Sequence, residues 1–220
     1  MIGALLFRLG VGATPFLLPL LLQVGFGLTP FQSGMITFAA AIGAMAMKFV
    51  APALLRRHGF RIVLILNALV AGAFVAMPAT FSPQTPILLM TGLLLIGGFF
   101  RSLQFTSTNA LTYADVPTEA MSRATSFASV AQQVSISTGV AIGALVLETM
   151  RATRGGGHTL ETSDFAVAFL VVAAIGMTSV YFYFKLPDDA GSELSGRGPK
   201  PPDATPPTAP DARGEVGTAG

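Results

Sequence analysis

The strongest candidate for chemistry in this sequence is Arg101, a cation inside a long apolar stretch. A charged side chain within a membrane costs about 2.5–3.5 kcal/mol or more, so it usually faces a water-filled cavity or a partner. At helical spacing Arg101 shares one face with Gly97, Gln104 and Thr108, which is typical of a cavity wall. In the alternative, the helix begins later and Arg101 extends to the cytoplasmic interface.

Glutamines in two other segments add candidate ligands. Gln23 follows Pro15 and Pro19, which lie one turn apart and predict a kinked helix with carbonyls turned toward a cavity. Gln132 and Gln133 could hydrogen-bond a substrate or hold helices together. We expect four residues to line a substrate cavity: Gln23, Arg101, Gln104 and Gln133.

Enzyme and metal chemistry is not indicated. His58 and His158 fall in predicted loops on opposite sides of the membrane, so they cannot share a metal or form a relay. The sequence has no cysteine, nucleophile elbow, phosphate-binding loop or zinc-protease motif. A net charge of +2 is too small to indicate nucleic acid. We therefore expect no enzymatic activity, cofactor, metal or nucleic-acid partner.

Two long uncharged runs predict the elements that carry these residues. No Asp, Glu, Lys or Arg occurs in residues 9–47 or 62–100, and about 20 apolar residues suffice for one membrane crossing. Turns rich in proline and glycine at 28–34 and 77–86 divide each run into two spans. Hydrophobic residues make up 52% of the chain and charged residues only 11%, which excludes an ordinary soluble domain.

Two further spans are predicted within 123–148 and 165–184. The first carries a ridge of small residues that would let another helix approach closely. This ridge consists of Ala131, Ser135, Gly139 and Gly143. Glu148 ends the same span, where we expect an interfacial role. Because a lipid-exposed backbone must satisfy its own polar groups, the predicted fold class is an all-α polytopic membrane protein with six transmembrane helices.

Basic residues predict the orientation of this bundle. Most of them fall on the side that holds both termini, including Arg8, Arg56, Arg57, Arg61 and Lys185. The excess of Lys and Arg places that side, and with it both termini, in the cytoplasm. After Pro187 the composition becomes too polar to bury a core. We expect a helical bundle over residues 1–187 and a disordered cytoplasmic tail over 188–220.

Several segments resemble one transporter family. Residues 16–34 resemble the seventh-helix signature and outer turn in the second half of drug:proton antiporters of the major facilitator superfamily, in the fourteen-span EmrB/QacA branch. Residues 109–117 and 124–139 resemble the same branch in order and spacing, most closely its MdtD/HsrA type. The resemblance covers about residues 5–187 and implies one six-helix half of that fold.

The loop after residue 51 resembles the superfamily pattern Gly-x-x-x-Asp-Arg-x-Gly-Arg-Arg/Lys in part. The sequence keeps Arg57, Gly59 and Arg61, but Pro52 replaces the leading glycine and Arg56 replaces the aspartate. A basic anchor that obeys the positive-inside rule explains these arginines equally well. We therefore infer no charge-relay gate through Arg56.

The resemblance implies proton-coupled efflux of drugs or other small molecules by alternating access. Proton antiport needs an acidic group, and no predicted span has a carboxylate near its middle. We expect the C-terminal half of a transporter, inactive without its N-terminal half, with the lipid bilayer and a small-molecule substrate as further partners. The alternative is a non-transporting membrane subunit or accessory protein whose polar residues serve helix packing.

Overall fold

The computed structural model describes residues 2–113, 116–153 and 160–187, and all regular structure in these ranges is helical. Six segments of the described chain are long and apolar enough to cross a membrane. They are Ile2–Gly25, Pro30–His58, Phe60–Thr80, Ile87–Tyr113, Thr118–Thr153 and Thr162–Phe184. The prediction of an all-α bundle with six membrane spans is confirmed. The tail predicted over 188–220 lies outside the described residues.

The first span is interrupted, as its two prolines predict. It consists of α1 (Ile2–Gly12), α2 (Thr14–Leu20) and the π-helix η1 (Leu21–Gly25). Pro15 opens α2 and Pro19 lies inside it. Since proline has no N–H and its ring clashes with the preceding turn, it removes helix hydrogen bonds and kinks or breaks a helix.

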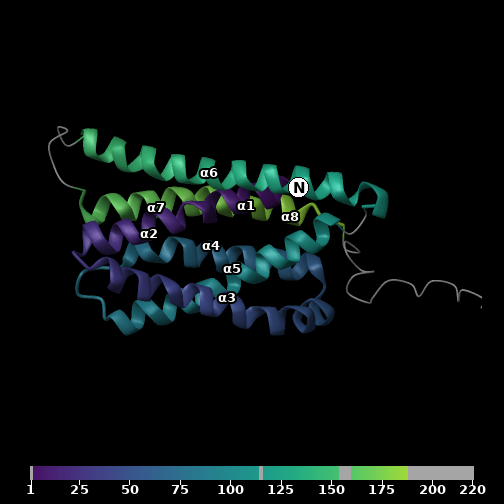
Figure 1. Ribbon diagram of the computed structural model, residues 1–220, viewed down its shortest axis with the longest axis horizontal. Helices are drawn as coiled ribbons and strands as arrows, with labels where there is room; N and C mark the ends of the chain where they lie inside the picture. Colours follow the sequence, from purple (N-terminus) through teal and green to yellow (C-terminus); the bar gives the residue numbers. More distant parts are fainter. Residues whose placement is uncertain (1, 114–115, 154–159, 188–220) are drawn as a thin grey trace, which may run out of the picture.

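The remaining spans are α3 (Pro30–His58), α4 (Phe60–Ala76) with η2 (Met77–Thr80), α5 (Ile87–Tyr113), η3 (Thr118–Ala120) with α6 (Met121–Thr153), and α7 (Thr162–Met177) with α8 (Ser179–Phe184). Figure 1 shows them in two layers: α6, α1, α2, α7 and α8 form one, and α3, α4 and α5 form the other. The N-terminus and α8 lie at the same end of the bundle (Figure 1). The layers meet mainly where α4 packs against α7 and α8.

The central helices are those of the first span, α4 and α7. In these spans 44–56% of the most apolar stretch is buried inside the bundle. In the spans of α3, α5 and α6 the buried share is only 22–28%. The enclosed side chains pack without exposure; they include Leu17, Leu22, Phe165, Phe169 and Val172. Since lipid is as apolar as these side chains, close packing rather than escape from water stabilises their contacts.

Glycines let the helices within each layer approach closely. A Cβ atom at Gly98 of α5 would overlap the Ala40 carbonyl oxygen of α3, and one at Gly139 of α6 would overlap the Leu9 carbonyl oxygen of α1. Gly139 belongs to the predicted small-residue ridge, and Ser135 and Gly143 of that ridge are also buried. The predicted packing role of the ridge is confirmed.

Two short connections set the ends of α3. Thr29 and Gln32 form a capping box at its N-terminus, in which the Thr29 hydroxyl accepts from the Gln32 N–H and the Gln32 amide oxygen accepts from the Thr29 N–H. Gly59 alone links α3 to α4 with φ 79°. This conformation favours glycine, because a Cβ atom is strained there.

Candidate substrate cavity

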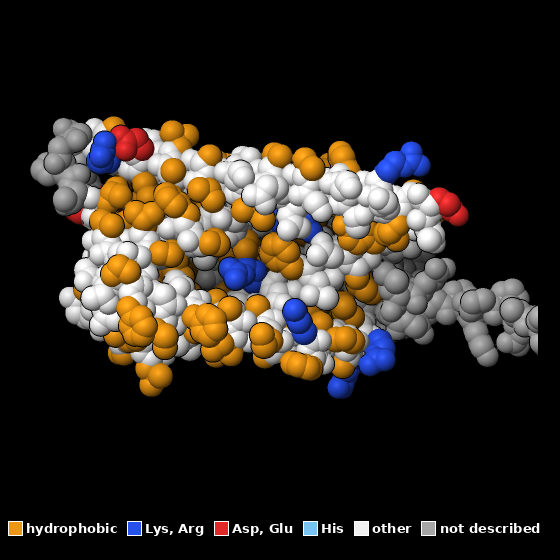
Figure 2. Space-filling model, viewed as in Figure 1, with side chains coloured by type: hydrophobic (Ala, Val, Ile, Leu, Met, Phe, Trp, Pro, Cys, Tyr) orange, Lys and Arg blue, Asp and Glu red, His pale blue; other side chains and the backbone are white. Residues whose placement is uncertain are grey.

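A cavity of about 200 Å³ lies between α2 of one layer and α3, α4 and α5 of the other. Pro15, Pro19 and Leu18 line it from α2, and Phe74 and Val75 line it from α4. Figure 2 shows this face of the molecule hollowed midway along its length, with basic side-chain atoms at the edge of the hollow. The interruption of the first span therefore forms part of the cavity wall.

Arg101 lines this cavity from near the middle of α5, together with Gly97 and Gly98. Its placement away from both helix ends favours the cavity over the interfacial alternative. No hydrogen bond or ion pair joins its guanidinium to another part of the described chain. The guanidinium is thus a cation on an otherwise largely apolar wall.

Two threonines, Thr14 and Thr37, are the other polar residues of the described chain on the cavity wall. The Thr37 hydroxyl donates to the Ser33 and Gly34 carbonyl oxygens of its own helix at 2.9 and 3.0 Å. The Thr14 hydroxyl is buried without a hydrogen-bond partner in the described part of the chain. Thr14 and Arg101 therefore supply the donors that a bound molecule could use.

Gln104 shares the helix face of Arg101 but is enclosed, with no exposed surface. Its amide oxygen accepts from Asn67 Nδ2 of α4 at 2.8 Å, and its Nε2 donates to the Leu64 carbonyl oxygen at 3.3 Å. Asn67 Nδ2 also donates to the Phe100 carbonyl oxygen at 2.9 Å. Gln104 is not among the residues that line the cavity, and it belongs to the packing of α4 against α5.

Arg8 of α1 is the second arginine within the apolar part of the bundle and is only 5% exposed. Its Nη2 donates to Asn109 Oδ1 of α5, and its Cζ lies 5.6 Å from the Phe105 ring centroid. These contacts give the cation an amide acceptor and an aromatic face. They also connect the two layers near the end of the bundle that holds the N-terminus.

The other two predicted cavity residues lie elsewhere. Gln23 is in η1, where its Nε2 donates to the Ser33 hydroxyl at 3.4 Å. Gln133 is exposed on α6, and no hydrogen bond within the described residues involves its amide. Of the four residues predicted to share a cavity, the structure places Arg101 alone on its wall.

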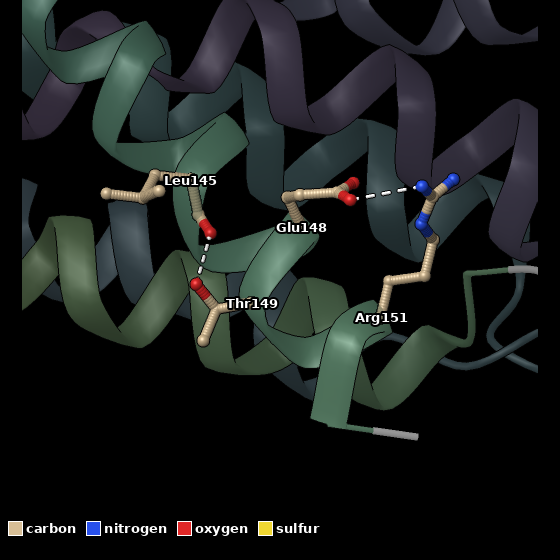
Figure 3. Close-up of polar contacts among 4 residues, drawn as sticks. All are labelled: Leu145, Glu148, Thr149 and Arg151. Carbon is tan, nitrogen blue, oxygen red and sulfur yellow. Dashed lines mark hydrogen bonds and ion pairs between the residues drawn. The ribbon is translucent and has the colours of Figure 1, made fainter. Parts of the chain in front are cut away.

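Polar side chains on α6 mostly bond to their own helix. The hydroxyls of Ser126, Ser129 and Thr138 donate to the carbonyl oxygen four residues earlier, which lowers the cost of facing lipid. Figure 3 shows the same arrangement for Thr149 and Leu145. Glu148 pairs with Arg151 at 3.0 Å near the helix end, and both side chains are exposed.

The residues of the partial loop motif lie at the α3–α4 turn. Gly59 forms the turn, and Arg57 is exposed at the end of α3. Arg61 Nη2 donates to the Phe184 carbonyl oxygen at 3.1 Å. A cation at the last carbonyls of a helix is favourable. The Arg61 contact therefore stabilises the packing of the start of α4 against the end of α8.

Acidic and imidazole side chains do not cluster in the described part of the chain, where no group of three or more His, Cys, Asp or Glu residues could hold a metal ion. Asp164, only 2% exposed, accepts a hydrogen bond from the Glu161 N–H in the first turn of α7. His158 lies outside the described residues.

Comparison with known proteins gives the same family as the sequence motifs. The profile of the Major Facilitator Superfamily matches residues 1–216. The chain is 32% identical over 197 residues to the multidrug resistance protein MdtD of Yersinia pestis (strain Pestoides F) and equally to that of Yersinia pseudotuberculosis serotype O:1b (strain IP 31758). Each match covers 87% of this chain and 42% of the relative, so the chain spans less than half the length of these relatives. No solved structure matches.

A profile match over almost the whole chain, together with six apolar helices in the described residues, leads to one conclusion. The chain belongs to the Major Facilitator Superfamily.

Proposed function

We propose that this chain is the C-terminal half of a proton-coupled efflux transporter for drugs or other small molecules, working by alternating access. Membership in a transporter family favours transport over catalysis. The observation that carries the proposal is Arg101, a cation without a partner in the described chain, on the wall of a cavity between the two helix layers. The relatives that this chain matches are named as multidrug resistance proteins.

The N-terminal half is the proposed partner of the exposed faces of α3, α5 and α6. These helices have the smallest buried share of the six spans, and the matched relatives are more than twice as long as the matched segment. In this arrangement Gln133 and Gln23 complete the cavity lining where the halves meet, and Gln104 holds α5 against α4 through Asn67. The chain alone would then not transport.

Proton coupling is assigned to the N-terminal half. The carboxylates in the described residues all lie near helix ends: Glu119, Glu148, Glu161 and Asp164. A proton-binding carboxylate near the middle of the membrane would therefore come from outside this segment.

The test is transport by the full-length protein in proteoliposomes with an imposed pH gradient. Arg101→Ala should abolish drug movement and cellular resistance at an unchanged level of protein in the membrane. Arg123→Ala, at an exposed position of α6, is the matched control and should transport normally. Normal transport by Arg101→Ala would contradict the cavity assignment.

The proposed location is the bacterial inner membrane, with a bundle over residues 1–187 and both termini in the cytoplasm. A reporter enzyme fused after Pro187 should report a cytoplasmic position, and one inserted at Gly156 an external position. The orientation follows from the basic residues at the end of the bundle that holds α8 and the α3–α4 turn. The reverse pattern of reporter activity would overturn it.

A non-transporting accessory protein is the second candidate, favoured by the use of Asn67 and Gln104 in helix packing. Expression of residues 1–187 with and without an N-terminal half separates the two functions. A half-transporter expressed alone should be degraded rapidly or self-associate, because its polar faces are exposed to lipid without the N-terminal half. A long-lived monomer, unaffected by the other half, would favour the accessory protein.

A further inference from the structure

The charge of the cavity points to a class of ligand. Among the described residues, Arg101 is the only charged residue that lines the cavity, and none of the lining residues is a carboxylate. The guanidinium makes no ion pair within the described residues, although Arg8 at another depth is engaged by Asn109. The cavity therefore carries a positive charge that the described chain does not balance.

The geometry of the guanidinium group restricts the kind of ligand that could balance the positive charge of the cavity. Arginine presents planar, parallel N–H donors that match a carboxylate or sulfonate in a bidentate arrangement. The attraction between the guanidinium and an anion is strong where the local dielectric constant is low. Here the surrounding side chains include the apolar residues Leu18, Phe74 and Leu94. The buried Thr14 hydroxyl, which has no partner within the described chain, adds a neutral donor from α2.

Size restricts the ligand further. The cavity of about 200 Å³ is smaller than the roughly 300–1,000 Å³ typical of pockets for drug-sized ligands. It has room for a compact molecule, or for one end of a larger molecule that continues toward the rest of the transporter. Its apolar and aromatic walls suit a hydrocarbon body next to the charged group.

We propose that the transported compounds are amphipathic anions, in which a carboxylate or sulfonate binds Arg101 and Thr14 while an apolar body contacts Phe74 and Leu94. This inference rests on the proposed transport function and specifies its substrate class. In the alternative, a carboxylate from the N-terminal half neutralises Arg101 and such anions do not bind. The test must distinguish this alternative from an anion site.

The test compares three probes of matched size: 2-naphthoate, 2-naphthalenemethanol and 2-naphthylmethylammonium. Calorimetry measures their binding to the full-length protein in lipid nanodiscs. We expect 2-naphthoate to bind about tenfold or more tightly than the alcohol, a difference of about 1.4 kcal/mol. Arg101→Gln should reduce its affinity to that of the alcohol, Arg101→Lys should retain part of the difference, and Arg123→Gln should leave it unchanged.

Each result has a separate meaning for the two proposals. Unchanged alcohol binding by Arg101→Gln shows that the variant is folded, so a selective loss of naphthoate binding supports the anion site. Equal affinity for 2-naphthoate and the alcohol, or tighter binding of the ammonium probe, overturns the anion site whether or not the protein transports other compounds. Tight naphthoate binding without pH-driven transport in proteoliposomes supports the anion site and overturns the efflux function.

Discussion

Arg8 and Arg101 are two cations inside the apolar part of one bundle, and their surroundings differ. Arg8 is 5% exposed, donates to Asn109 and lies over the Phe105 ring. Arg101 lines a cavity and has no hydrogen bond within the described chain. Both residues would carry the cost of an intramembrane charge, but only for Arg8 does the described chain supply the compensation.

This difference separates a structural arginine from one that is available to a ligand. The contacts of Arg8 connect α1 to α5 and so hold the two layers together at one end. Arg101 occupies the middle of α5, where the interrupted first span leaves room. Substitutions at the Arg8 site should therefore lower mainly stability, and substitutions of Arg101 should lower mainly transport.

The largest effect on stability is expected for Asn109→Leu, which removes the acceptor of a buried cation. Leaving a buried charged donor without its acceptor costs about 1–3 kcal/mol or more, so the thermal unfolding midpoint in detergent and the membrane level should both fall. Arg101→Leu should change the midpoint less, because the Arg101 guanidinium has no hydrogen bond or ion pair within the described chain to lose. Asn109→Asp, which keeps an acceptor, serves as the conservative control.

A double variant sharpens the same comparison. Replacing both partners by apolar residues removes the unmatched charge, so Arg8→Met combined with Asn109→Leu should recover most of the stability lost in Asn109→Leu. A double variant as unstable as Asn109→Leu alone would mean that Arg8 does not depend on Asn109.

A moderate effect is expected from the glycine contact beside Arg101. In Gly98→Ala the new methyl group would overlap the Ala40 carbonyl oxygen, and such overpacking costs about 1–3 kcal/mol. Gly92→Ala in the same helix meets no atom within 4 Å and should gain up to about 1 kcal/mol from helix propensity. Unfolding midpoints of both variants test this; equal midpoints would contradict the α3–α5 contact.

The sequence predicts the spans better than the site. Helix number follows from the spacing of charges and turn residues, because each crossing requires an uncharged length set by the bilayer. Arg101 is recognisable because it interrupts such a length. Arg8 lies near a predicted span end, where a basic residue normally reaches the interface, and its burial depends on the packing of α5 and α8 against α1.

Helical periodicity also gives the face of a residue but not the depth at which a bundle closes. Arg101 and Gln104 share a face, yet one lines the cavity and the other is enclosed beside Asn67. Asn67 is an amide within an uncharged apolar run, and this signal could have indicated a buried polar contact. Thr14 has no comparable signal, since threonine is common in apolar helices.

The smallest effect is expected for Arg151, an arginine that is neither enclosed nor in a cavity. Its pair with Glu148 spans one helical turn near the end of α6, and the two side chains are 46% and 62% exposed. Solvent and salt screen such pairs, which contribute about 0.5 kcal/mol or less. Arg151→Ala should therefore leave both transport and the unfolding midpoint nearly unchanged, and added salt should remove any residual difference. A loss comparable to that of Asn109→Leu would show that this pair is buried against another part of the full-length protein, and Arg151 would then belong with Arg8 as a structural residue.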